Sequence, residues 1–202
     1  WHWAAAALVC GLLVQRLSGR MAAGFVTATG VFCLTWQTSV EPSHPGSHIM
    51  LLVALAEGLA AKLVTARRSR PILAAGLGVI IALVVLTKIN VGGFLAIAVG
   101  AAFIRFHGIG SERLRGPVQI GWSAFTLLLP WLLVGAKAAE PWVFTLCLLT
   151  TLANAGLIWI EPSARQRTGG GAWLGLVLGG MITTLVVCLV VVIRGTTVVQ
   201  LW

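Results

Sequence analysis

The sequence predicts an all-α protein, a polytopic transmembrane helix bundle of about eight spans. Three observations lead to this prediction. Of the 202 residues, 58% are hydrophobic and only 9% are charged, and the mean hydropathy is +0.98. A soluble domain of this size needs many more charged side chains on its surface. The apolar residues also form separate segments whose length fits the roughly 17–25 residues that cross a hydrocarbon core.

The expected spans follow one another with short connections, which hold most of the Gly, Pro, Ser and charged residues. The first is truncated, and the fourth and fifth almost touch, which leaves room only for a tight helical hairpin at 88–93. We treat 1–202 as a single transmembrane domain and expect it to be an internal fragment of a longer protein. The spans cover residues 1–15, 20–37, 48–66, 71–88, 90–106, 117–136, 141–160 and 172–193.

The basic residues alternate from one connection to the next. Most lie in every second connection, and only three lie on the other side. Because cytoplasmic loops carry the excess of Lys and Arg, the larger set is expected in the cytoplasm. An even number of spans then places the N- and C-terminal ends of the fragment outside. The larger set comprises Arg16, Arg20, Lys62, Arg67, Arg68, Arg70, Arg105, Arg113, Arg115, Arg165 and Arg167, and the smaller set Lys88, Lys137 and Arg194.

The net charge of +9 could also suit a nucleic-acid binder. The basic residues come in small groups between apolar segments, however, and never form the face of a soluble module. We therefore expect the lipid bilayer as a partner and no nucleic acid. The four cysteines lie inside apolar segments without C-x-x-C spacing, which favours buried packing over a disulfide or a metal site.

Polar residues collect on the expected extracytoplasmic side. The loop at 36–48 contains Glu41, His44 and His48, and an imidazole three residues from a carboxylate could transfer a proton or bind a metal. A solvated turn rich in Pro and Ser is the alternative interpretation. A metal site would need a third ligand, which His48, four residues after His44, could supply. We assign no metal ligands and no cofactor, and a divalent metal ion at this loop is the alternative.

Lys88 and Asn90 interrupt an otherwise apolar stretch at the same side of the membrane. An ammonium group at the edge of the hydrocarbon can reach outward to an anion such as a phosphate, and the dry surroundings strengthen that pair. Plain interfacial anchoring is the alternative for Lys88. Asn90 could cap the following helix, and Gly92 and Gly93 could permit close helix packing.

Glu57 lies near the centre of the third expected span. An ionised acid there costs roughly 2.5–3.5 kcal/mol on insertion scales, so its side chain should be protonated, paired or exposed to water. It is a candidate for a substrate or proton path, with a hydrogen bond between helices as the alternative.

Two short motifs stand at the ends of expected spans. RLSGR at 16–20 precedes a span, and the run GVIIALVVLTK at 78–88 ends one. They resemble the R-L-x-G-R turn and the G-x-x-x-x-x-L-x-x-L-T-K run of type C glycosyltransferases, among bacterial relatives of the dolichyl-phosphate-mannose–protein mannosyltransferase and aminoarabinose transferase group; here Gly78 is one residue closer to Leu83 than in that pattern. The EPSHPG loop at 41–46 is similar to an E-P-G-H-P loop in some members. The resemblance covers roughly residues 10–105, and Ile89 departs from the Pro or small residue that often follows the T-K pair.

The resemblance implies an enzyme of the bacterial inner membrane that moves a hexose or pentose from a polyprenyl-phosphate-linked sugar to an acceptor on the extracytoplasmic face. It places Lys88 near the lipid phosphate, where its charge would balance that of the leaving group. It also implies that Glu41 and His44, the catalytic candidates, line the same cavity as Lys88, and that the principal catalytic acid lies upstream of Trp1. Asn90, His48 and Glu57 are the further candidates for substrate binding. The alternatives are a multi-span transporter or flippase, which should have helices broken near the midplane, and a non-catalytic membrane scaffold.

Overall fold

The computed structural model describes residues 2–38, 46–65, 70–107, 112–135, 140–141, 144–145, 147–149, 151–152 and 170–194. All secondary-structure elements in these ranges are helical, as the sequence predicts. Their bounds lie close to the expected segments. The helices are α1 (His2–Ser18), α2 (Met21–Thr38), α3 (Gly46–Thr65), α4 (Pro71–Thr87), α5 (Ile89–His107), α6 (Glu112–Val134) and α8 (Gly170–Ile193).

Two segments differ from the expectation in their bounds. Helix α6 begins at Glu112 rather than at residue 117. Its first turn is polar, so hydropathy alone does not indicate that these residues belong to the helix. Of the expected span 141–160, the described residues at 144–145, 147–149 and 151–152 are helical, and 153–160 lie outside the described residues.

Within the described part of the chain, α8 alone is both long and apolar enough to cross a membrane. Its 24 residues contain a window with a mean hydropathy of 2.9, in which only 6% of the residues are fully buried and the others are half-buried or exposed. Shorter apolar helices cover Ala4–Arg16, Met21–Cys33, Pro71–Thr87 and Val91–Arg105.

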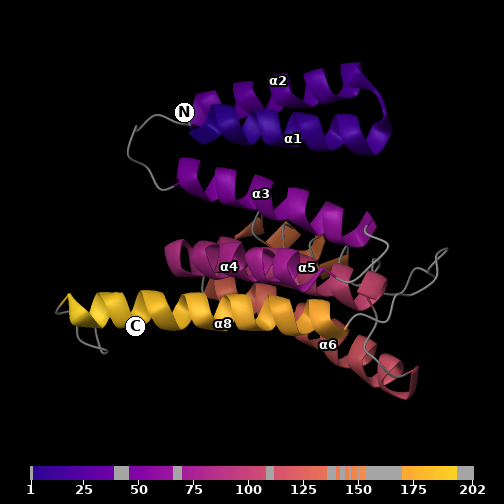
Figure 1. Ribbon diagram of the computed structural model, residues 1–202, viewed down its shortest axis with the longest axis vertical. Coiled ribbons are helices and arrows are strands. Elements are labelled where there is room, and N and C mark those ends of the chain that lie inside the picture. Colours follow the sequence, from indigo (N-terminus) through magenta and orange to yellow (C-terminus); the bar gives the residue numbers. More distant parts are fainter. Residues whose placement is uncertain are drawn as a thin grey trace. The chain divides into compact units, whose positions relative to one another are not determined.

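The chain divides into two compact units, Trp1–Thr65 and Ala66–Trp202. In the first unit, α1 and α2 form an antiparallel hairpin (Figure 1). A Cβ atom on Gly24 would lie 2.6 Å from the Cβ of Gln15, and one on Gly11 would lie 2.7 Å from the Cβ of Ala28. The two glycines therefore let the helix backbones approach more closely than any larger residue would allow.

The turn between α1 and α2 is fixed by three neighbouring residues. Gly19 adopts a φ of +68°, a conformation that glycine reaches without steric cost. Its N–H donates to the Gln15 carbonyl over 2.9 Å, which closes the last turn of α1. The Ser18 hydroxyl donates to the Val14 carbonyl over 2.7 Å and accepts the N–H of Arg20 over 3.2 Å. The RLSGR motif thus reverses the chain within the few residues between the two helices.

Helix α3 lies beside α1 and runs in the same direction. The rings of His2 and His48, near the beginning of each helix, have their centroids 4.0 Å apart with an interplanar angle of 39°. Further along both helices, Cys10 is close enough to Glu57 for a Coulombic interaction. Because both pairs advance together along the two helices, α1 and α3 are parallel.

The second unit is built on α4 and α8, which also run parallel and lie side by side (Figure 1). A Cβ atom on Gly175 would collide with the Pro71 carbonyl, and one on Gly179 would collide with the Ala75 carbonyl. These contacts recur every four residues on each helix. The small residues of each helix therefore lie along one face, and these two faces meet. This is the small-xxx-small packing typical of helices in membranes.

Helices α4 and α5 form the tight hairpin that the sequence predicts, and Lys88 is its whole connection. Lys88 is extended, with φ −154° and ψ 97°; its N–H donates to the Val84 carbonyl over 2.8 Å. Its carbonyl accepts the N–H of Gly92 over 3.0 Å. A Cβ on Gly92 would collide with the backbone of Val85, so the expected close packing at Gly92 is confirmed.

Helix α6 packs antiparallel to α5, and residues around 144–152 pack in turn on α6. Pro130 has no N–H to donate to the carbonyl of Thr126, four residues earlier in α6. The Thr151 hydroxyl donates to that carbonyl instead, over 3.4 Å, and both threonines are buried. The rings of Trp131 and Phe144 also meet, with centroids 5.2 Å apart. A side chain from another segment thus replaces the backbone bond that proline removes.

Candidate functional site

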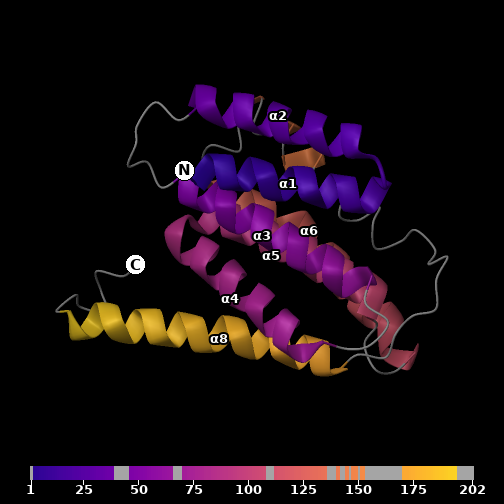
Figure 2. The same ribbon diagram turned by 45° about the horizontal axis from the view of Figure 1, so that its top comes forward.

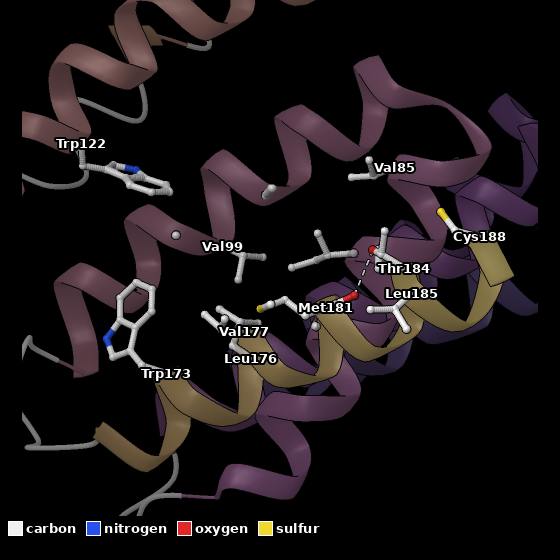
Figure 3. Close-up of a pocket in the computed structure, with 16 residues that line it drawn as sticks. Val85, Val99, Trp122, Trp173, Leu176, Val177, Met181, Thr184, Leu185 and Cys188 are labelled. Carbon is white, nitrogen blue, oxygen red and sulfur yellow. Dashed lines mark hydrogen bonds between the residues drawn. The ribbon is translucent and has the colours of Figure 1, made fainter. Parts of the chain in front are cut away.

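The second unit contains an open groove of about 710 Å³ between α4, α5, α6 and α8 (Figure 3). This volume falls within the range of roughly 300–1,000 Å³ that is usual for small-molecule sites. Its lining is almost wholly apolar. The lining residues are Gly78, Ile81, Ala82, Val85, Ala96, Val99, Gly100, Trp122, Trp173, Leu176, Val177, Gly180, Met181, Thr184, Leu185 and Cys188.

The groove arises from the way α4 and α8 cross. The two helices meet in their first halves, where Gly78 lies against Leu176 and Gly180, and diverge toward their C-terminal ends (Figure 2). Side chains from both helices and from α5 line the space that opens beyond this contact. The glycines that bring the helices together therefore also fix where the groove begins.

Two tryptophans, Trp122 from the middle of α6 and Trp173 from the first turn of α8, line one end of the groove (Figure 3). The Trp122 indole lies against Gly100, where any Cβ atom would collide with the ring. Trp173 makes an edge-to-face contact with Phe103, with ring centroids 5.3 Å apart and an interplanar angle of 78°. Both indoles pack on the small buried cluster of Ala101 and Ile104. These contacts hold the two rings in place at this end of the groove.

The groove offers few polar atoms to a ligand. The Thr184 hydroxyl donates to the Gly180 carbonyl over 3.0 Å, so its hydrogen is already used within α8 (Figure 3). The Nε1 atom of Trp122 is buried, and no hydrogen-bond partner for it lies in the described ranges. An unpaired buried N–H of this kind costs about 1–3 kcal/mol. The chemistry of the lining suits an apolar ligand.

Two cationic residues lie beyond the other end of the groove. Lys88 follows Val85 by three residues at the C-terminal end of α4, and Arg194 follows Cys188 just past the end of α8. Both side chains are exposed. Because α4 and α8 are parallel, both cations lie at the same end of the unit. Lys88 also precedes the first turn of α5, whose free backbone N–H groups favour anions.

Asn90, His48 and Glu57 are the other predicted site residues that the structure describes. Asn90 lies inside the first turn of α5 and not at its N-cap, which differs from the expected capping role; its side chain lies outside the described parts. His48 and Glu57 are exposed on α3 of the first unit, nine residues and thus roughly 13 Å apart along the helix. The structure therefore does not bring these two side chains together.

Glu41 and His44, the candidate catalytic residues, lie outside the described residues. In the ranges that the structure describes, no three His, Cys, Asp or Glu side chains converge on one point that could hold a metal ion.

The groove is a feature that the sequence interpretation missed. A signal for it was present: Gly175 and Gly179 on α8, and Ala74, Gly78 and Ala82 on α4, have the four-residue spacing of small residues that marks a helix contact. That spacing indicates which faces meet. It does not indicate that the helices diverge afterwards.

No protein-family model, no curated protein and no solved structure matches this chain.

Proposed function

We propose that this chain is a multi-pass protein of the bacterial inner membrane, with about eight spans. The helix directions within each unit support this. In an alternating path, the neighbouring spans run in opposite directions and every second span runs in the same direction. The antiparallel pairs α1–α2, α4–α5 and α5–α6 and the parallel pairs α1–α3 and α4–α8 all fit that rule.

The ends of the helices carry charge in the same pattern. Where α1 ends, α2 begins and α3 ends, the chain has Arg16, Arg20 and Lys62. Where α4 begins, α5 ends and α6 begins, it has Arg70, Arg105 and Arg113. These ends would face the cytoplasm under the positive-inside rule. Lys88 would then lie on the extracytoplasmic side.

We further propose that the protein takes part in sugar transfer from a polyprenyl-phosphate donor to an acceptor hydroxyl on the extracytoplasmic face. The single observation that carries this proposal is the position of Lys88. It forms the entire α4–α5 connection, is exposed, precedes the amides at the start of α5, and lies one turn beyond a groove suited to an apolar chain. An amphiphile with a phosphate head and a hydrocarbon tail matches that combination.

In the proposed reaction the acceptor oxygen attacks the anomeric carbon of the sugar. The bond from that carbon to the phosphate oxygen breaks, and the polyprenyl phosphate leaves with the electron pair. The acceptor hydroxyl loses its proton to a base. The leaving phosphate gains negative charge, which the Lys88 ammonium group would offset more strongly at the edge of a low-dielectric region than in water.

A transporter or flippase would call for a helix broken part-way along a span. The break at Lys88 lies instead between the end of one helix and the start of the next, and not part-way along either. We therefore place sugar transfer first, and transport or a scaffold role after it.

The test is the affinity of the purified chain for undecaprenyl phosphate in detergent, measured by native mass spectrometry. We expect Lys88→Ala to weaken binding at least tenfold and Lys88→Arg to retain most of it. Arg113→Ala, which removes an exposed cation from the opposite end of the same unit, is the matched control and should change binding less than twofold. Unchanged affinity in Lys88→Ala would remove the phosphate role.

A further inference from the structure

Helices α1 and α3 of the first unit begin side by side, and each carries a histidine in its first turn (Figure 2). His2 is the first residue of α1, His48 is the third residue of α3, and the centroids of their imidazole rings lie 4.0 Å apart. We infer that His2 and His48 together bind a zinc ion, Zn²⁺. This site belongs to the first unit, whereas Lys88 and the groove belong to the second, so it does not depend on the function proposed above.

Buried neighbours hold both first turns in place, while the two imidazoles remain accessible. Ala6, one turn after His2, is 1% exposed, and Ile49, directly after His48, is 5% exposed. Both histidine side chains are exposed. The two helices therefore keep the imidazoles near each other before any ion binds, and an ion can reach the rings from the surroundings. Such preorganisation lowers the entropy that is lost on binding.

The ring positions are close to those of two imidazoles on one ion. Zn²⁺ binds imidazole nitrogen at about 2.0–2.1 Å, which places the centroids of two rings on the same ion roughly 4.5–5 Å apart. The His2 and His48 centroids, 4.0 Å apart with an interplanar angle of 39°, need to separate by only about 1 Å to accept it. The χ2 angle of histidine is broadly distributed, and because both side chains are exposed, a small rotation of each ring is enough.

The type of ligand atom selects the ion. Imidazole nitrogen suits Zn²⁺, Cu²⁺ and Ni²⁺, whereas Mg²⁺ and Ca²⁺ prefer the oxygens of carboxylates, carbonyls and water. The described residues contribute this pair and no third His, Cys, Asp or Glu side chain beside it. A tetrahedral Zn²⁺ ion takes two further ligands, which water or another donor can supply. We therefore expect Zn²⁺ to bind in the presence of excess Mg²⁺.

Because each helix contributes one imidazole, the bound ion would join α1 to α3. An ion that binds the folded state alone stabilises it by an amount that grows with the logarithm of the ion concentration above the Kd. Zn²⁺ should therefore raise the melting temperature of the wild type. It should leave the melting temperature unchanged when either histidine is replaced.

The test is isothermal titration of the purified chain in detergent with zinc chloride, in excess magnesium chloride. We expect one Zn²⁺ per chain at the tightest site. His2→Ala and His48→Ala should each weaken its affinity at least tenfold, because each variant leaves a single imidazole. His107→Ala, which removes a histidine of the second unit, is the matched control and should change the affinity less than twofold.

The two single variants exclude different alternatives. If only His48→Ala loses binding, the ion lies at the loop that contains His44, and the inference is wrong. If only His2→Ala loses binding, other groups at the start of α1 hold the ion, which also overturns the inference. His2→Gln and His48→Gln, which keep a polar side chain of similar size, serve if an alanine variant loses its helical circular dichroism. Binding that survives both glutamine substitutions would contradict the site.

Discussion

In the first unit the most extensive helix contact joins neighbours in the chain, α1 and α2, whereas in the second it joins α4 and α8, which lie roughly eighty residues apart in the sequence. Both contacts rely on glycine. In the hairpin, Gly11 and Gly24 face each other across a turn of a few residues. In the second unit, Gly78, Gly175 and Gly179 join helices that no short turn holds together.

The α1–α2 and α4–α8 pairs differ in the constraints that act on them besides their packing. The α1–α2 hairpin is also constrained by its short turn, because closing a short loop leaves the chain few alternatives. The α4–α8 pair has only its packing, and its helices are free to diverge beyond the glycines. A groove therefore forms in the second unit, where the contact is local to one half of each helix.

The largest effect is expected for Gly78→Ala. A Cβ atom at this position would collide with the Leu176 carbonyl, so α4 and α8 must move apart. Forcing one methyl group into such a contact costs on the order of 3 kcal/mol. We expect a marked drop in the melting temperature, measured by circular dichroism in detergent.

Gly121→Ala is the control for that measurement. Its Cβ meets nothing within 4 Å, and Ala is preferred over Gly inside a helix by roughly 0.5–1 kcal/mol. Its melting temperature should stay the same or rise. A Gly78→Ala protein that melts with the wild type would contradict the role given to the α4–α8 contact.

A smaller effect is expected for Gly19→Ala in the first unit. The φ of +68° costs an alanine roughly 1–2 kcal/mol, although nothing stands within 4 Å of the added methyl group. We expect a modest fall in melting temperature, because the substitution strains one turn and no helix contact is lost. Gly30→Ala, also in open space but inside α2, is the matched control and should not lower the melting temperature. A fall as large as that of Gly78→Ala would contradict this ranking.

Much of the helix pattern could be predicted from the sequence, because apolar length and loop charge are local properties. The one-residue hairpin at Lys88 followed from two apolar segments that almost touch. The pairing of α4 with α8 could not be predicted in this way, since it depends on which small-residue stripes meet across a long sequence separation. The groove is still harder to predict from the sequence, because it depends on the crossing angle of those helices.

The candidate site was predicted in part. Lys88 was singled out because an ammonium group is costly in an apolar stretch, and it follows Val85, which lines the groove, by three residues. Trp122 and Trp173 were not singled out, because tryptophans near helix ends are usual for membrane proteins and give no signal of a ligand. His48 and Glu57 were chosen as polar residues in apolar surroundings, and they lie well apart along α3.

The central claim is that the helices cross a membrane with their arginine-bearing ends inside. The most direct test is labelling of single cysteines in intact bacteria with a membrane-impermeant maleimide, in a chain whose four native cysteines are replaced. The proposed topology predicts that Ile89→Cys, beside Lys88, is labelled in intact cells, and that Ser18→Cys and Arg113→Cys are labelled only after the cells are permeabilised. Labelling of Ser18→Cys or Arg113→Cys from outside, with Ile89→Cys protected, would contradict it.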